Sequence, residues 1–371
     1  MLRKLLTSFT TVCILYFSGS AQSDSTATTP AVSPSPTITG SVDVYYRYNF
    51  ANPKSGGTNN FTSFTNSHNS FELGMASIKA DHSFGKASAT IDLGFGRRAE
   101  EFSYNDGDPE DPIITKNGFF TLASVKQAYL SYAVSDKFKF TAGKWATHIG
   151  YELLDAYLNR NYSMDYMFSF GPFSHTGLKA DISLGGKSAL MLGVANPSDM
   201  VTVTTPPKFL IAQFSTASSD SKFKAYLNYQ GGRFAIASTL NQVDLVLLAT
   251  ITDKFNIGYN GTVQSRKIVG NADSWWGSAL YFNVDPTSTF GLTLRGEYFS
   301  DKKDVLGVFT DGTINGTNIF DVTLSPNFKV GNLTIIPELR LDAAKNAIFE
   351  KNDGTSTKST FTGLLAATYH F

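Results

Sequence analysis

Few residues in this sequence could carry enzymatic or metal chemistry. None of its histidines is spaced as a metal-binding motif; they are His68, His82, His148, His175 and His370. His148 and His175 stand at the two ends of one long segment, where we expect hydrogen bonding and keep metal binding as the alternative. Neither a Gly-x-Ser-x-Gly sequence nor a phosphate loop occurs. The sequence therefore predicts no catalytic residue, no cofactor and no metal.

Ionisable side chains are concentrated in that segment, residues 145–176. Its charged residues and tyrosines include Tyr151, Glu152, Asp155, Tyr157, Arg160, Tyr162 and Asp165. Connections of this length are usually functional. At the narrow point of a channel, such carboxylates would favour cations electrostatically.

The elements that must position these side chains are strands. From Ile38 to Phe50, apolar and polar residues alternate, so that Val42 and Val44 share one face and Asp43 and Arg47 the other. This period of two is typical of a strand with one apolar face, and a charged face needs water beside it. The same pattern recurs at 87–98, 255–264 and 290–298. We therefore predict a polar interior lined by Asp43, Arg47, Asp92, Arg98, Lys179, Asp181, Arg295, Glu297, Arg340 and Asp342.

The number and spacing of the strands indicate the fold class. We count about sixteen, each close to the ~9–11 residues that cross a bilayer at a tilt. The phase is ambiguous at 75–82 and 233–240, so fourteen or eighteen strands stay open. Short turns alternate with long loops, as in a meander through a membrane, whereas a soluble propeller or sandwich has no reason to place its long loops on one side. The prediction is an all-β, transmembrane, antiparallel up-and-down β-barrel.

The start of the chain carries a different pattern. A basic start, an apolar run at 5–17 and small residues at Gly19 and Ala21 predict a signal peptide, residues 1–21, because the run is shorter than the ~20 residues of a membrane-spanning helix. Residues 22–36 are rich in Ser, Thr and Pro and predict a disordered lead-in before a barrel at 37–371. Cys13, the single cysteine, lies in the segment to be removed.

Composition supports a membrane barrel over a nucleic-acid-binding protein. Acidic and basic residues are equal at 31 each, so no strong field attracts nucleic acid. Charged residues are 17% of the chain, below the ~25% of ordinary soluble domains. The last strand ends on Phe371, which resembles the terminal signal of outer-membrane barrels.

Three runs carry a resemblance to a known family: GKWATHIGYE at 143–152, NRNYS at 159–163 and GPFSHTG at 171–177. They resemble the OmpL-like β-barrel porins of Bacteroidetes-type Gram-negative bacteria, and the likeness extends loosely over 37–371. As the third long loop of the barrel, 145–176 also resembles the inward constriction loop of general porins. The resemblance implies an outer-membrane pore.

Together these observations predict a porin through which small hydrophilic solutes or ions diffuse passively, with 145–176 as an inward loop that narrows the pore. The alternative for the loop is an outward segment that contacts another protomer or the cell surface. The alternative function is a closed structural or adhesive barrel that binds a partner through its external loops. We expect outer-membrane lipid as a partner, no nucleic acid, and, by analogy with other porins, a homotrimer.

Overall fold

The structure is a computed structural model, and it describes residues 34–104, 122–203, 208–235, 238–268, 270–309 and 315–371. The predicted signal peptide at 1–21 and residues 22–33 of the predicted lead-in lie outside the described residues. Residues 35–371 form one compact unit.

That unit is a closed barrel of sixteen antiparallel strands, which confirms the predicted fold class and strand number. Its first eight strands are β1 (Thr37–Asn49), β2 (Ser70–Phe84), β3 (Ala87–Phe95), β4 (Val125–Ser135), β5 (Phe138–Ala146), β6 (Ser174–Gly185), β7 (Ser188–Ala195) and β8 (Phe209–Ala217). The other eight are β9 (Phe223–Ala235), β10 (Ser238–Thr252), β11 (Phe255–Ile268), β12 (Ala272–Val284), β13 (Phe290–Asp301), β14 (Thr317–Val330), β15 (Leu333–Ala344) and β18 (Ser359–His370).

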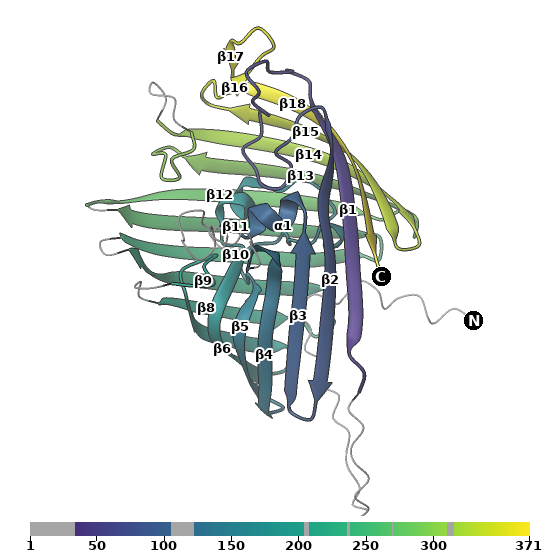
Figure 1. The fold of residues 1–371 in the computed structure, drawn as a ribbon, viewed down its shortest axis with the longest axis vertical. Helices are drawn as coiled ribbons and strands as arrows, with labels where there is room; N and C mark the ends of the chain where they lie inside the picture. The colour runs from purple at the N-terminus through teal and green to yellow at the C-terminus, as the bar shows by residue number, and fades with distance from the viewer. Residues whose placement is uncertain (1–33, 105–121, 204–207, 236–237, 269, 310–314) are drawn as a thin grey trace, which may run out of the picture. The chain divides into compact units, whose positions relative to one another are not determined.

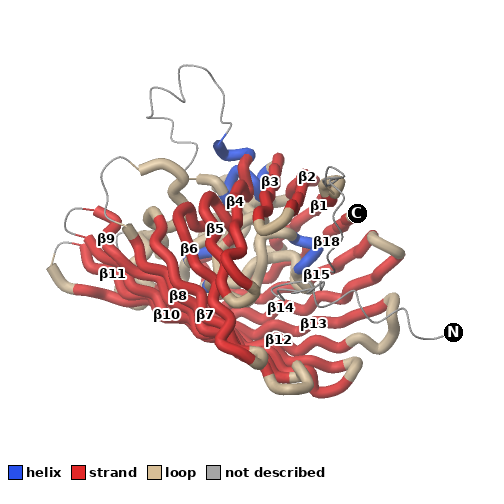
Figure 2. Tube along the Cα trace, turned by 90° about the horizontal axis from the view of Figure 1, so that it is seen from below, coloured by secondary structure: helices blue, strands red, loops and turns tan. Residues whose placement is uncertain are grey.

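Closure joins the two ends of the barrel sequence. β1 pairs with β18 from Ser41, opposite His370, to Asn49, opposite Thr362. In Figure 1 the purple first strand accordingly lies beside the yellow last strands, and in Figure 2 the labels β2, β1, β18 and β15 follow one another. A closed ring leaves no strand edge unpaired, which is the condition for a sheet to survive in lipid.

The alternation in the sequence sets the two faces of the wall. In β1, Asp43 and Arg47 are each 3% exposed, whereas Val42 and Val44 are 43% and 44% exposed. Polar residues therefore face the interior and apolar residues face outward, as the period of two predicts. The two ambiguous regions resolve as strand: β2 covers 75–82, and β9 and β10 are separated only by 236–237.

Connections differ at the two ends of the barrel. One end has short connections, such as 136–137, 186–187 and 331–332, and the other has long ones, such as 50–69 and 147–173. The long connections contain α1 (Arg97–Phe102), η1 (Leu122–Ser124), η2 (Ala156–Leu158), α3 (Tyr166–Phe170) and the small sheet of β16 (Phe349–Glu350) and β17 (Ser356–Thr357). None of the helices in the described part of the chain has the length and apolar character that crossing a bilayer requires.

The buried apolar core lies inside the barrel. One cluster joins Phe64, Phe102, Phe168 and Phe173, which come from three different long connections, to Met75 of β2. Another packs Tyr166 and Met167 of α3 against β12 and β13. The long connections therefore fold onto the inner wall, as Figure 2 also shows for the helices in blue.

Candidate functional site

The segment between β5 and β6, residues 147–173, passes through the barrel interior, and we call it the inner loop. Near its start, the backbone N–H of Gly150 donates to Asp244 Oδ1 on β10 at 3.1 Å. Further on, the N–H of Tyr162 donates to Glu338 Oε2 on β15 at 2.7 Å. The N–H groups of Tyr166 and Met167 then donate to the carboxylate of Glu297 on β13 at 2.7 and 2.9 Å. Polar groups on the wall thus satisfy the loop backbone, which would otherwise be left unpaired without water.

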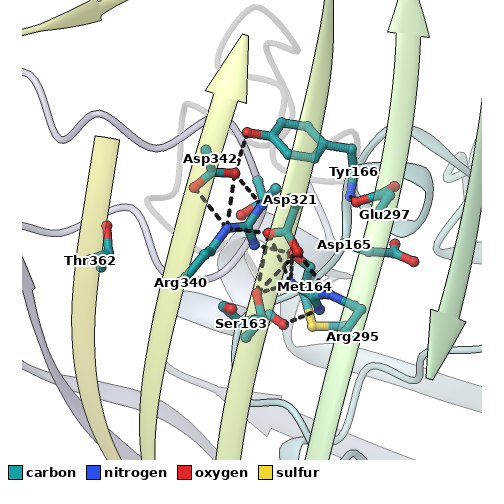
Figure 3. A network of polar contacts seen from close by, with 12 residues as sticks. Ser163, Met164, Asp165, Tyr166, Arg295, Glu297, Asp321, Arg340, Asp342 and Thr362 are labelled. Atoms are coloured by element: carbon teal, nitrogen blue, oxygen red, sulfur yellow. Dashed lines mark hydrogen bonds and ion pairs between the residues drawn. The ribbon is translucent and has the colours of Figure 1, made fainter. Parts of the chain in front are cut away.

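Two arginines of the wall hold the middle of the inner loop (Figure 3). Arg295 on β13 forms an ion pair with Glu152 of the loop at 2.7 Å and donates to the carbonyl of Ser163 at 2.7 Å. Arg340 on β15 donates to the carbonyl of Met164 at 2.7 Å. The planar guanidinium group suits this role because it presents five donors in a fixed geometry.

Carboxylates on neighbouring strands balance these arginines. Asp321 on β14 lies 3.3 Å from Arg295 and 2.7 Å from Arg340, and Asp342 on β15 lies 2.8 Å from Arg340. The hydroxyl of Tyr166 donates to Asp342 Oδ1 at 2.8 Å, as Figure 3 shows. Arg295 and Asp321 are fully buried, so this part of the interior is filled by protein.

A third arginine, in the connection after β3, also holds the loop. Arg98 of α1 donates to the carbonyls of Leu154 and Tyr162 at 3.1 and 3.4 Å, and its Nε lies 3.9 Å from Asp43 on β1. Its guanidinium also stacks over the rings of Phe64 and Tyr162 at 4.8 and 5.0 Å. Because stacked guanidinium groups tolerate low hydration, this arginine can be fully buried.

The tip of the inner loop reaches the end of the barrel that has short connections. Arg160 forms an ion pair with Asp285, in the turn between β12 and β13, and Lys329 of β14 lies 3.3 Å from the same carboxylate. The ring of Tyr157 stacks on His370, at the end of β18, with centroids 4.8 Å apart. The loop therefore spans much of the length of the barrel interior.

Comparison with known proteins agrees with this architecture. The family model described as "Putative beta-barrel porin-2, OmpL-like" matches residues 35–371. The chain belongs to this OmpL-like porin family. None of the curated proteins matches it in sequence.

Several solved structures share the fold of this OmpL-like chain. An anion-selective porin from Comamonas acidovorans is 10% identical with a TM-score of 0.59, over 91% of this chain and 99% of the other. The outer-membrane channel DcaP of Acinetobacter baumannii is 12% identical with a TM-score of 0.57, over 91% and 97%. OmpT of Vibrio cholerae is 10% identical with a TM-score of 0.55, over 91% and 97%. At these identities the likeness concerns the fold.

In this OmpL-like barrel the residues of the predicted constriction divide into two groups. Glu152, Tyr162 and Asp165 are buried, and Tyr151 stacks on Tyr281 of β12 with ring centroids 4.0 Å apart. Asp155 and Arg160 each keep 17% of the side chain exposed, and Tyr157 is also partly exposed. The connection is also shorter than 145–176, because the ladder between β5 and β6 continues to Ala146 and Ser174.

The predicted interior charges mostly lie on the inner face, but the long connections cover them. The buried ones are Asp43, Arg47, Asp92, Arg295, Glu297, Arg340 and Asp342. Arg47, for instance, donates to the carbonyls of Thr58 and Ser67 at 2.8 and 2.7 Å, both in the connection after β1. Lys179 and Asp181 on β6 stay partly exposed, with 21% and 18% of their side chains accessible. Arg98 is also buried, but its predicted place on the inner face of a strand is wrong. It lies in α1, because β3 ends at Phe95 and Gly96 takes a φ of 111°.

Alternation alone would also have missed two buried lysines. Lys126 of β4 lies 3.2 Å from Asp92 and 2.6 Å from Asp155. It points inward because the register between β3 and β4 shifts at this position. Lys144 of β5 is 3% exposed and lies over the ring of Phe102 at 5.3 Å, directly after Gly143, which has a φ of 131°. A bulge or glycine in the strand is the only sequence signal for such residues, and it does not identify which residue turns inward.

The two histidines at the ends of the inner loop do meet. The rings of His148 and His175 lie 4.9 Å apart, and His148 Nε2 is 3.1 Å from the carbonyl oxygen of Tyr229. Burial lowers the pKa of His148 to about 4, so it is neutral at pH 7. Within the described residues, no group of three or more His, Cys, Asp or Glu side chains could hold a metal ion.

A buried aspartate fixes the other end of the loop. Asp199, in the connection after β7, accepts hydrogen bonds at 2.7 Å from the N–H groups of both Phe173 and Ser174. Burial raises the pKa of Asp199 to about 7, and these two hydrogen bonds oppose the rise. Asp199 can accept these two hydrogen bonds both as a carboxylic acid and as a carboxylate.

Proposed function

We propose that this chain is an outer-membrane porin that lets small hydrophilic solutes or ions diffuse passively along a water-filled path between the inner loop and the wall. The observation that carries the proposal is the partial exposure of charged side chains on the inner face of β2 and β5. Lys79, Asp81 and Lys139 keep 35%, 40% and 27% of their side chains accessible. Charges inside a barrel need water or partners, and these have both. Diffusion down a gradient uses neither a cofactor nor a catalytic group.

We further propose that the inner loop sets the limiting aperture of this path. Its contacts with β10, β13 and β15 support the proposal, because a segment fixed to several sides of the wall divides the interior. Asp155 and Arg160 are the charged loop residues that keep contact with water.

The lipid bilayer is the proposed environment of the outer face. Leucines such as Leu130, Leu210 and Leu227 are 67%, 61% and 51% exposed there, which suits hydrocarbon better than water. Insertion would follow removal of residues 1–21 as a signal peptide. A homotrimer is the proposed assembly; a trimer form is reported for OmpT of Vibrio cholerae, which shares the fold at a TM-score of 0.54.

The alternative is a closed barrel with a structural or adhesive role. It is favoured by the complete burial of Arg295, Glu297 and Asp321, because charges with no exposed surface do not line an open channel at their level. At the level of these three residues, a porin then requires the path to run on the side of β2 to β6.

Planar-bilayer recording of the mature protein separates the two functions. We expect stepwise conductance from the wild type and a larger conductance when residues 154–168 are replaced by a short Gly/Ser linker, since the narrowest section dominates the resistance. The matched control is the same replacement in the exposed connection at 351–355, which should leave conductance unchanged. Heat-modifiable migration on a gel checks that each barrel has folded. A folded, inserted wild type without conductance contradicts the porin, and an unchanged conductance in the loop variant contradicts the aperture.

A further inference from the structure

Two clusters of charge lie near the end of the barrel that has short connections. In the first, Lys139 of β5 and Lys179 of β6 lie 3.6 and 3.8 Å from the same carboxylate, Asp181. In the second, Arg160 and Lys329 share the carboxylate of Asp285. We call these the β5–β6 cluster and the β12–β14 cluster. In each of them two cations share one carboxylate, so the formal charge of the three side chains is +1.

The two clusters lie on opposite walls. In the order of strands around the barrel, six strands (β7 to β12) separate β6 from β13 on one side, and six (β15, β18 and β1 to β4) separate β14 from β5 on the other. Both clusters are close to short connections: Lys139 is the second residue of β5, and Lys329 is the last but one of β14. A solute that passes this end of the barrel therefore moves between them.

Water reaches both clusters. The accessible fraction of the side chain is 27% for Lys139, 21% for Lys179, 22% for Lys329 and 17% for Arg160. The buried carboxylates Glu152 and Asp165 of the inner loop differ, because they hydrogen-bond to Arg295 and Tyr281 inside the protein. Charges that contact water act on a passing ion, whereas buried pairs largely cancel each other.

The other charged side chains that the structure describes near this end are mostly paired with each other. Lys79 and Asp81 form a neutral pair at 3.0 Å, and Asp155 is paired with Lys126 at 2.6 Å. Asp92 beside that pair is 2% exposed. The short turns themselves add exposed lysines in excess of aspartates: Lys86, Lys137, Lys187, Lys222 and Lys254 against Asp136, Asp220 and Asp253.

We propose that the β5–β6 and β12–β14 clusters make this porin prefer small anions over cations. The inference rests on the proposed function, since it names the class of ion that the water-filled path favours. An anion preference is the opposite of the cation preference that the sequence predicts from the carboxylates of the inner loop. Positive side chains on both walls of a water-filled path raise the local concentration of anions and lower that of cations.

The test is the zero-current potential of single channels under a gradient of potassium chloride. We expect the wild type to give the sign of chloride preference. The variant Lys139→Gln/Lys179→Gln/Lys329→Gln should shift the potential to zero or reverse it. Asp181→Asn/Asp285→Asn should shift it the other way, toward stronger chloride preference. The matched control, Lys302→Gln/Lys303→Gln/Lys345→Gln, removes three exposed lysines from the long connections and should keep the wild-type potential.

Each other outcome overturns a defined statement. Cation preference in the wild type, an unchanged potential in the first triple variant, or an equal shift in the control would overturn the charge assignment while leaving the porin intact. Absence of conductance from correctly folded, inserted wild type would instead overturn the proposed function.

Discussion

Replacing Arg295 should release the inner loop from the wall without opening the barrel. Arg295 is fully buried, forms the ion pair with Glu152 at 2.7 Å and donates to the carbonyl of Ser163 at 2.7 Å. In Arg295→Met, Glu152 stays buried without that cation. Asp321 keeps its ion pair with Arg340 at 2.7 Å, so the loss falls mainly on Glu152.

The size of the effect follows from this arrangement. Removing one partner of a buried ion pair costs about 3–5 kcal/mol, and we take the lower end, ~3 kcal/mol, because one of the two carboxylates keeps a partner. At ~1.4 kcal/mol per factor of ten, the docking equilibrium of the loop should fall about 100-fold. The barrel should persist because its closure depends on the backbone ladder and not on the loop.

Arg97→Met is the matched control. Arg97 also contacts two carboxylates, Glu72 at 3.3 Å and Glu101 at 3.4 Å, but 36% of its side chain is exposed. Exposed ion pairs contribute about 0–1 kcal/mol to stability. In Arg97→Met the inner loop should therefore dock almost as it does in the wild type.

Hydrogen exchange of the amides at 147–173 measures the docking, and single-channel recording measures its consequence. Arg295→Met should exchange these amides faster than Arg97→Met and show larger or more frequent openings. The double variant Arg295→Met/Glu152→Gln should recover part of the protection, because it removes the unpaired charge. If the loop amides are as well protected from exchange in Arg295→Met as in Arg97→Met, while both barrels migrate as folded, the ion pairs do not hold the loop.

Two further predictions concern the wall and pH. Leu294→Arg, on the outward face of β13, should impair assembly because a charge at the bilayer midplane costs about 2–4 kcal/mol. The control Gln213→Arg, on the inner face of β8, should assemble. Equal heat-modifiable migration of the two variants on a gel would refute the assigned faces. The pKa of Asp199 is raised from 3.8 to about 7, so its contribution to docking is complete below 3.8 and is lost as the pH rises through about 7. Exchange of the Phe173 and Ser174 amides should therefore speed up over that range beyond its intrinsic pH dependence, and Asp199→Asn should remove this excess; the same excess in the variant would show that Asp199 is not its origin.

The period of two in the sequence was enough to determine the wall. It placed Asp43 and Arg47 on the inner face and Val42 and Val44 on the outer face, because each strand residue points opposite to its neighbour. Short and long connections in alternation predicted the meander and about sixteen strands, and the structure decided among fourteen, sixteen and eighteen. These predictions rest on local or repeated signals that need no knowledge of distant residues.

Only the tertiary structure decided which inward residues meet each other and which meet water. Tyr162 binds Glu338, 176 positions along the chain, and this contact depends on the closure of the barrel and the path of the inner loop. Lys126 turns inward at a register shift, and Arg98 leaves the strand for α1. Strand periodicity tells which side of the wall a residue faces but not what lies opposite across the interior. Glu152 and Lys179 are both predicted to be inward charges, whereas in the folded barrel Glu152 is buried in an ion pair and 21% of the Lys179 side chain is exposed.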